Sequence, residues 1–272
     1  MKAWAAWQRQ ITFLLLCLPG MTWASDNVFI TGPGVQPPAI ALIIDDLGSQ
    51  IAKGKRAIGL PGPVACSFLP GGKHTAELAR LAHRNEKEVM LHLPMQALGQ
   101  SLTRQHHGEL TTDMPREDFL DTLARDIAAV PHASGVNNHR GSLLTQQTGN
   151  MGWLMQALHD HGELFFIDSR TTRETIAQDM ALAYGVPSAS RNVFLDNDPS
   201  PDAVRAQFRE LLDRARRDGT ALAIGHPHPV TLNILAEELP RLEQQGVLLL
   251  SVSELIARQQ ERRLVWQGSS SP

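Results

Sequence analysis

Short apolar runs alternate with amphipathic segments along most of the chain. The runs are rich in Val, Ile and Phe, which is typical of strands buried in a parallel sheet. They lie at residues 40–44, 64–69, 88–93, 133–138, 163–167, 192–195, 220–225 and 247–250. This strand-then-helix order predicts an α/β fold, a single irregular (β/α) barrel of about seven to eight parallel strands, with an open doubly wound sheet as the alternative.

Most of the segments between these runs have helical spacing, because their apolar residues recur at intervals of three and four. Two of them carry start signals. Ser200 followed by Pro201 predicts a helix that begins at Pro201. Thr171 and Glu174 have the spacing of a capping box, which predicts a helix over residues 176–182.

The first residues form a separate piece. A basic start, an apolar run over residues 11–18 and small residues ending at Ala24 predict a secretory signal peptide over residues 1–24. This implies export across an inner membrane to the periplasm, and an uncleaved membrane tether is the alternative. Residues 25–38 then read as an extended lead-in, 39–262 as the folded domain and 263–272 as a flexible tail.

The composition narrows the class of protein. Hydrophobic residues make up 42% of the chain and charged residues 19%, which excludes a disordered or collagen-like protein. The net charge of −3 leaves no strong basic field, so we expect no nucleic-acid partner. After removal of the signal peptide, Cys66 would be the only cysteine, which excludes an internal disulfide. No later apolar stretch is long enough for a stable membrane anchor.

Acidic and imidazole side chains gather where the predicted strands end. Five of the runs lead directly into such residues, which are Asp45 and Asp46, His92, His139, Asp168 and His226. The carboxyl ends of parallel strands meet on one face of a barrel, where ligands bind. Charged groups at the rim of an apolar strand are costly unless they are paired or bound to a metal, so we expect a functional site on this face.

Each of these residues also has a structural alternative. Asp45 and Asp46 are adjacent carboxylates that repel each other, and one helix start needs only one cap, which favours a cation or a shared proton. Asp168 could be the N-cap of the next helix. His92 and His139 could each be core histidines bonded to the backbone, but together with Asp46 they favour a ligand role.

Other motifs are weaker or absent. The sequence His226-Pro227-His228-Pro229 could be a rigid turn, and we expect His226 to act at the strand end with His228 peripheral. The chain contains no G-x-S-x-G, H-E-x-x-H, C-x-x-C, Walker or strand-linked G-x-G-x-x-G motif. Their absence disfavours serine-nucleophile hydrolysis, zincin-type proteolysis and dinucleotide binding.

Five ordered motifs resemble one known family. They are IIDDLG at 43–48, HLPM at 92–95, NNHRGS at 137–142, FIDS at 166–169 and IGHP at 224–227. Together they resemble the divergent polysaccharide deacetylases of secreted bacterial proteins, over about residues 38–260. That family is similar to the polysaccharide deacetylases, which are metal-dependent enzymes on an irregular (β/α) barrel.

The resemblance implies roles for the strand-end residues. Asp45 matches the catalytic base, and Asp46 matches the metal-ligating second Asp. His92 matches the first metal-binding His. His226 falls where the deacetylases keep the general acid, and Asp168 near the motif that supports the catalytic groups.

The chain also departs from the deacetylase pattern. The second metal-binding His, four residues after the first, is replaced by Gln96, and a neutral amide binds a transition metal more weakly than an imidazole. We expect His139 to supply the missing ligand, which gives an Asp-His-His set suited to a divalent metal, with zinc expected. The third deacetylase motif usually carries an Arg that orients the base. Here Asn138 and Arg140 are candidate substrate contacts in that motif.

The expected function is that of a metal-dependent hydrolase. It would remove acetyl groups from an N-acetylated cell-envelope polysaccharide, such as a peptidoglycan-type glycan. The alternative is a catalytically weak or inactive deacetylase-like barrel that binds an envelope glycan or a protein. A metal phosphoesterase is a third hypothesis, disfavoured because few basic residues lie at the strand ends.

Overall fold

The computed structural model describes residues 36–99 and 108–269. The predicted signal peptide and most of the predicted lead-in lie outside these residues. Among the described residues, no helix combines the length and the apolar character that a membrane span requires.

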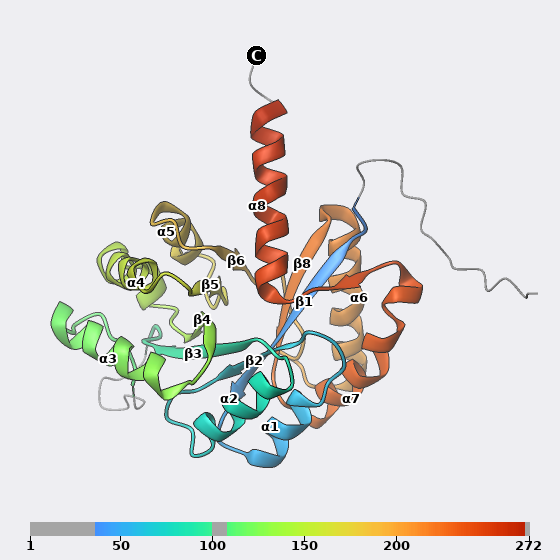
Figure 1. Cartoon of the computed structure of the whole chain (residues 1–272), viewed down its shortest axis with the longest axis horizontal. Coiled ribbons are helices and arrows are strands. Elements are labelled where there is room, and N and C mark those ends of the chain that lie inside the picture. Colours follow the sequence, from blue (N-terminus) through green and yellow to red (C-terminus); the bar gives the residue numbers. More distant parts are fainter. Residues whose placement is uncertain (1–35, 100–107, 270–272) are drawn as a thin grey trace, which may run out of the picture. The chain divides into compact units, whose positions relative to one another are not determined.

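All strands belong to one parallel sheet (Figure 1). Its order is β6-β5-β4-β3-β2-β1-β8-β7, and β9 pairs with β1. The strands are β1 (Ala39–Leu47), β2 (Ala65–Phe68), β3 (Val89–Met95), β4 (Ala133–Arg140), β5 (Phe165–Asp168), β6 (Ser188–Ser190), β7 (Val193–Phe194), β8 (Thr220–Gly225) and β9 (Leu248–Leu249). The two outer strands of this order, β6 and β7, are joined by only Arg191 and Asn192. The sheet therefore curls until its ends approach each other, which confirms the predicted barrel.

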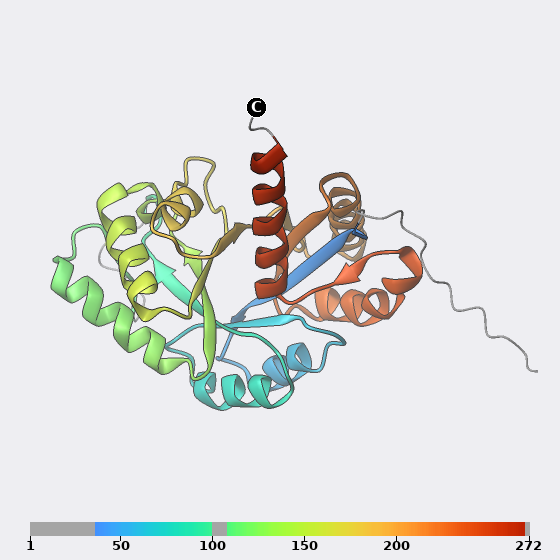
Figure 2. The same ribbon diagram turned by 45° about the horizontal axis from the view of Figure 1, so that its top comes forward.

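Helices cover the outside of this curled sheet (Figures 1 and 2). They are α1 (Ile51–Ile58), α2 (Thr75–Arg84), α3 (Arg116–Ala129), α4 (Thr148–His161), α5 (Ala177–Ala183), α6 (Pro201–Asp218) and α7 (Pro229–Glu238). The last helix, α8 (Val252–Ser269), projects from one end of the sheet instead. The apolar faces of α1 to α7 share one large core with the outward side chains of the strands.

The alternation of side chains along the strands divides the core in two. In β1, Ile40, Leu42 and Ile44 pack in the core that the helices share, whereas Ala41 and Ile43 belong to a second, inner core. Successive strand residues point to opposite faces of a sheet. The next inward-pointing residue after Ile43 is the polar Asp45. The same alternation makes the last inward-pointing residues of β2, β3 and β4 polar as well; these include Ser67, His92 and Asn137.

The last helix closes the opposite end of the barrel. Val252, Leu255 and Ile256 of α8 belong to the inner core. Further along α8, Arg258 bonds the carbonyl of Pro37, and Gln259 lies 3.1 Å from the hydroxyl of Thr220. These contacts lie at the amino ends of β1 and β8. Helix α8 therefore covers the end of the barrel opposite to the polar residues, which lie at the carboxyl ends of the strands.

Each of the eight predicted strand segments contains a strand, and within residues 36–99 and 108–269 the pattern missed only β6. Helix α6 begins at Pro201 with Ser200 in the N-cap position, as predicted. The helix predicted over residues 176–182 is confirmed as α5, but the predicted capping box is wrong, because the N-cap of α5 is Ile176 and not Thr171. The Thr171 hydroxyl instead donates to the carbonyl of Arg140, 2.8 Å away, so that this segment is a loop tied to β4. Helix α8 runs into the predicted tail, as far as Ser269.

Candidate active site

Both carboxylates of the Asp45-Asp46 pair reach the same face because the backbone is irregular there. In a regular strand Asp45 would point inward and Asp46 outward. The pairing register between β1 and β2 shifts between Ile44 and Leu47, and Asp46 has a φ of 57°. A bulge with a left-handed residue re-aims a side chain. This conformation allows the Asp46 carboxylate to lie at the barrel mouth beside the inward-pointing residues.

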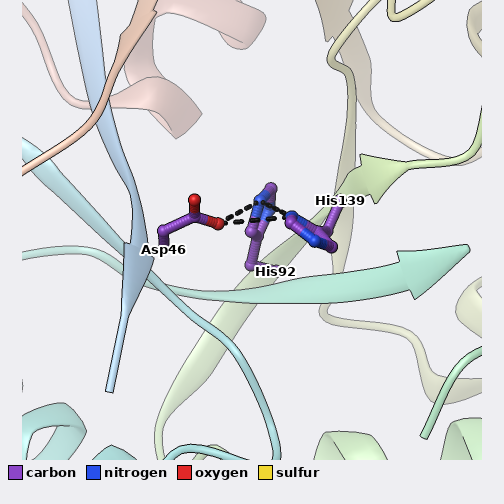
Figure 3. A group of neighbouring side chains, drawn as sticks. All are labelled: Asp46, His92 and His139. Carbon is purple, nitrogen blue, oxygen red and sulfur yellow. Dashed lines mark hydrogen bonds and ion pairs between the residues drawn. The ribbon is translucent and has the colours of Figure 1, made fainter. Parts of the chain in front are cut away.

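Asp46, His92 and His139 form a compact triangle at the ends of β1, β3 and β4 (Figure 3). Asp46 Oδ1 lies 3.3 Å from His92 Nε2 and 3.2 Å from His139 Nδ1, and the two ring nitrogens are 3.1 Å apart. Ligands of a tetrahedral zinc, with bonds of about 2.0–2.1 Å, are about 3.3 Å from one another. Asp46 Oδ1 is also buried without a hydrogen-bond partner. The residues present therefore fit a divalent metal of this type.

The electrostatics of the triangle depend on burial and on close charges. Burial would raise the pKa of Asp46, but the close approach of the His139 and His92 rings outweighs it and lowers that pKa. Burial opposes charge on His92, yet the carboxylates of Asp45 and Asp46 raise the pKa of this ring. For His139, burial wins and the pKa is lowered. The carboxylate is thus ionised, and His139 favours the neutral form that binds metals.

Asp45 is buried next to the triangle and is held by an amide. It is 3% exposed, and the side-chain nitrogen of Asn137 lies 2.9 Å and 3.1 Å from its two oxygens. His92 Nε2 is 3.6 Å from the Asp45 Oδ2 atom. The predicted base is therefore in the same cluster as the predicted metal ligands.

His226 approaches the cluster from the end of β8. Its Nδ1 lies 2.9 Å from Asp196 Oδ1, and its Nε2 is 3.7 Å from Asp46 Oδ2. Burial opposes protonation, but the bond to Asp196 and the nearby carboxylates raise the pKa of His226. Asp196 itself accepts further bonds from the His226 backbone N–H and the Thr231 hydroxyl, each 2.7 Å long. These contacts fix the orientation of the imidazole.

The structure brings the other predicted site residues to different places. Asp168 has the outward parity of Phe166, which packs in the helix-side core. Its carboxylate accepts bonds from the Arg170 N–H at 2.8 Å and the Thr175 hydroxyl at 3.0 Å, and burial raises its pKa. These partners belong to the loop that follows β5. The catalytic role of Asp168 stays a prediction that this position does not favour.

By the same alternation, Asn138 lies on the outward, helix-facing side of the sheet with Val136. It is 1% exposed, its oxygen accepts from the Ser169 N–H at 2.8 Å, and its nitrogen donates to the Arg140 carbonyl at 2.7 Å. The Arg140 residue is exposed, with a φ of 56°. Asn138 thus ties the loops after β4 and β5 together, and substrate binding by this pair stays a prediction.

Gln96 stands where the deacetylases have their second metal-binding His, but its side chain bonds to Thr112. Its side-chain oxygen accepts bonds from the Thr112 N–H at 2.8 Å and the Thr112 hydroxyl at 2.9 Å. Its backbone carbonyl accepts from the N–H groups of Leu143 and Leu144, each at 3.2 Å. The side chain thus braces the loops beside β3, and the second imidazole of the cluster comes from β4.

Two residues of the site were missed by the sequence reasoning. Asp196 directly follows the predicted strand at 192–195, so the strand-end signal applied to it as well. Asn137 directly precedes Asn138 and His139, which were singled out, and the period of two would have placed it on the inward face with His139.

A cavity with a volume of about 310 Å³ opens beside the cluster. The residues that line it include Asp46 and His226 of the cluster, together with Gln50, Lys53 and His228. A substrate in this cavity would lie directly next to the His226 ring.

The fold and the cluster define a (β/α)-barrel protein with metal-ligand side chains at the carboxyl ends of its strands. The profile of the divergent polysaccharide deacetylase family matches residues 42–256. The chain belongs to this family.

Related proteins of known sequence and structure are similar over most of the chain. The uncharacterized protein YibQ of Escherichia coli K12 is 34% identical over 217 residues, which are 80% of this chain and 67% of that protein. The crystal structure of the uncharacterized protein ATU2773 from Agrobacterium tumefaciens has a TM-score of 0.76 and 21% identity, and the match covers 83% of this chain and 92% of that one.

A more distant match is a mutant of BA3943, which is described as a CE4 family pseudoenzyme with restored enzymatic activity. Its TM-score is 0.50 at 15% identity, and the match covers 81% of this chain and 68% of that one. At this level of identity the structural matches show the fold alone.

Proposed function

We propose that this protein is a metal-dependent hydrolase that removes acetyl groups from an N-acetylated envelope polysaccharide in the periplasm. The observation that carries the proposal is the triangle of Asp46, His92 and His139, whose three ligand atoms are 3.1–3.3 Å apart. Membership of the divergent polysaccharide deacetylase family supports the substrate class. The predicted signal peptide supports the compartment.

Asp46, His92 and His139 would hold the ion, with zinc as the expected metal. A bound divalent ion would supply a water of lowered pKa and would polarise the acetyl carbonyl. Three protein ligands are the number that catalytic zinc sites use, which would leave one ligand position of a tetrahedral ion for water or substrate.

Asp45 is the proposed general base. Its carboxylate lies 3.6 Å from a nitrogen of the ligand His92, within the same cluster, so a water at the site would be close to it. The two bonds from Asn137 orient the carboxylate. Asp45 would take a proton from the attacking water as the oxygen of that water bonds to the acetyl carbon.

His226 is the proposed general acid. Its Nδ1 is engaged by Asp196, which leaves Nε2 to face the barrel mouth, 3.7 Å from Asp46 Oδ2. The raised pKa of the ring favours the protonated form that an acid requires. His226 would give its Nε2 proton to the sugar nitrogen as the C–N bond breaks, which releases acetate and a free amine.

The test combines metal binding with acetate release. Purified protein should bind about one zinc ion per chain, and His92→Ala and His139→Ala should lose it. His161→Ala, which removes an exposed histidine at the end of α4, is the matched control and should retain the metal.

The metal-loaded protein should also release acetate from N-acetylated peptidoglycan fragments or chitooligosaccharides, and Asp45→Asn should abolish release while metal stays bound. Full metal occupancy in His92→Ala and His139→Ala would refute the ligand set. Metal-loaded protein that binds glycan but releases no acetate would instead identify a non-catalytic module.

A further inference from the structure

One buried amide joins the proposed base to a proposed metal ligand. Asn137 of β4 is completely buried and inward-facing. Its side chain contacts Asp45 on one side, and Ser67 and His92 on the other. These residues come from β1, β2 and β3, so that four neighbouring strands meet at this single carboxamide.

The charge of Asp45 determines which way the amide points. An ionised carboxylate only accepts hydrogen bonds, so the NH₂ group must face Asp45. The Nδ2 atom lies 2.9 Å and 3.1 Å from the two Asp45 oxygens. The reverse orientation would set the amide oxygen against the carboxylate. The Oδ1 atom therefore faces the Ser67 hydroxyl at 2.6 Å and His92 Nδ1 at 3.0 Å.

This orientation has a consequence for the imidazole. An amide oxygen can only accept, so His92 Nδ1 must carry a proton to bond with it. In the neutral ring the lone pair is then on Nε2, and Nε2 is the atom that lies 3.3 Å from Asp46 Oδ1 and 3.1 Å from His139 Nδ1. Hydrogen bonds to the outer nitrogen of a ligand histidine are known to set its tautomer and its orientation.

We propose that Asn137 is a positioning residue that holds His92 in the tautomer with a free Nε2 lone pair and at the same time orients the Asp45 carboxylate. The orientation of Asp45 has a catalytic role only if the proposed function is correct. The tautomer of His92, in contrast, can be measured whether or not the protein is an enzyme. Both side-chain hydrogen bonds recorded for Asp45 among the described residues come from Asn137. A single amide thus aligns the base with the ligand set.

The first experiment uses the unmodified protein without substrate. Long-range ¹⁵N–¹H NMR of the imidazole distinguishes the two neutral tautomers. At alkaline pH, where the ring is neutral, we expect the His92 proton on Nδ1 in the metal-free protein. The same proton should be retained, and protected from exchange, in the zinc-loaded protein. A proton on Nε2 in the metal-free protein would overturn the inference, whatever the protein does to a glycan.

Variants separate the two actions of the amide. Asn137→Asp keeps an acceptor for His92 Nδ1 but replaces the NH₂ donor with a second carboxyl oxygen about 3 Å from Asp45, so that Asp45 must share a proton with it and is no longer a free base. This variant should keep the His92 tautomer and the zinc affinity, while kcat for acetate release falls about 10²-fold with the metal site saturated. Asn137→Ala loses both bonds, so the tautomers should mix and zinc affinity should fall about 10- to 100-fold.

Ser67→Ala is the matched control, because it removes a second donor to the same Oδ1 atom and leaves the His92 and Asp45 bonds in place. It should keep the tautomer, the zinc affinity and kcat. Equal losses in Ser67→Ala and Asn137→Asp would show a merely structural role and overturn the proposal. If Asn137→Ala does not fold, the NMR result on the unmodified protein and the Asn137→Asp comparison still decide. A protein without deacetylase activity could still show the expected tautomer and zinc affinities, so failure of the proposed function is distinguishable.

Discussion

Replacing Asp196 by Asn should move the pH range in which His226 can act as an acid. The change keeps the size of the side chain and removes its charge. The Asp196 Oδ2 atom accepts bonds from the His226 backbone N–H and the Thr231 hydroxyl, so the oxygen of the new amide should take that side. The NH₂ group would then face His226 Nδ1, which can no longer donate to it.

The magnitude follows from the bond that is lost. The His226 Nδ1 to Asp196 Oδ1 contact is 2.9 Å long and joins a carboxylate to a ring that is charged as an acid. A hydrogen bond to a charged group contributes about 1.5–3 kcal/mol. One pKa unit corresponds to about 1.4 kcal/mol, so the pKa of His226 should fall by about 1–2 units. Since this pKa is raised in the native protein, the protonated fraction falls most at pH values above the new pKa.

The assay is acetate release by the zinc-loaded protein as a function of pH. The basic limb of kcat/KM should shift to lower pH by about 1–2 units, and an NMR titration of the His226 ring should show the same shift. Asp198→Asn, the same exchange at an exposed residue nearby, should shift neither. A basic limb that stays in place in Asp196→Asn, with a normal rate, would refute the assignment of His226 as an acid held by Asp196.

Three further predictions concern stability and reactivity. Burial raises the pKa of Asp126 from 3.8 to about 7 in the folded protein. As the pH rises from 3.8 toward 7, the unfolded chain loses this proton while the folded protein keeps it, so the free energy of unfolding falls. Asp126→Asn should therefore raise the free energy of unfolding by about 2 kcal/mol at about pH 8 and have no such effect at about pH 3, as measured by urea denaturation, and equal effects at both pH values would contradict the sign. Glu88→Ala should lower stability by about 1 kcal/mol, because the Glu88 carboxylate accepts the Val252 N–H at 2.6 Å and the Ser253 N–H at 3.1 Å at the start of α8. Cys66 is buried and burial raises its pKa to about 12, so a thiol reagent should modify it only after unfolding, and rapid labelling of the native protein would argue against this burial.

Much of the barrel could be predicted because the local pattern and the tertiary fold agree. The longer apolar runs became strands whose residues are buried on both faces, one against the helices and the other inside the barrel. The strand β6 was missed because its three residues, Ser188–Ser190, carry no apolar run. Its edge position and its pairing with β5 are properties of the assembled sheet.

The candidate site was only partly predictable for a similar reason. Strand ends identified Asp45, Asp46, His92, His139 and His226, and the structure places all five around one barrel mouth. Asp168 shares the same strand-end signal but has the opposite parity, so it bonds to the loop after β5 instead. Asp196 became visible as a partner only when β7 and β8 were placed side by side.

The sequence alone shows where polar groups interrupt the apolar strands. A buried strand consists of apolar residues, so any Asp or His at its end stands out in the pattern. Only the tertiary structure decides which of these groups meet. The left-handed turn at Asp46 brings two neighbouring carboxylates to one face, and the packing of β4 beside β3 sets His139 next to His92 where Gln96 could not serve. Such contacts join residues that are far apart along the chain, and no local preference encodes the distance between them.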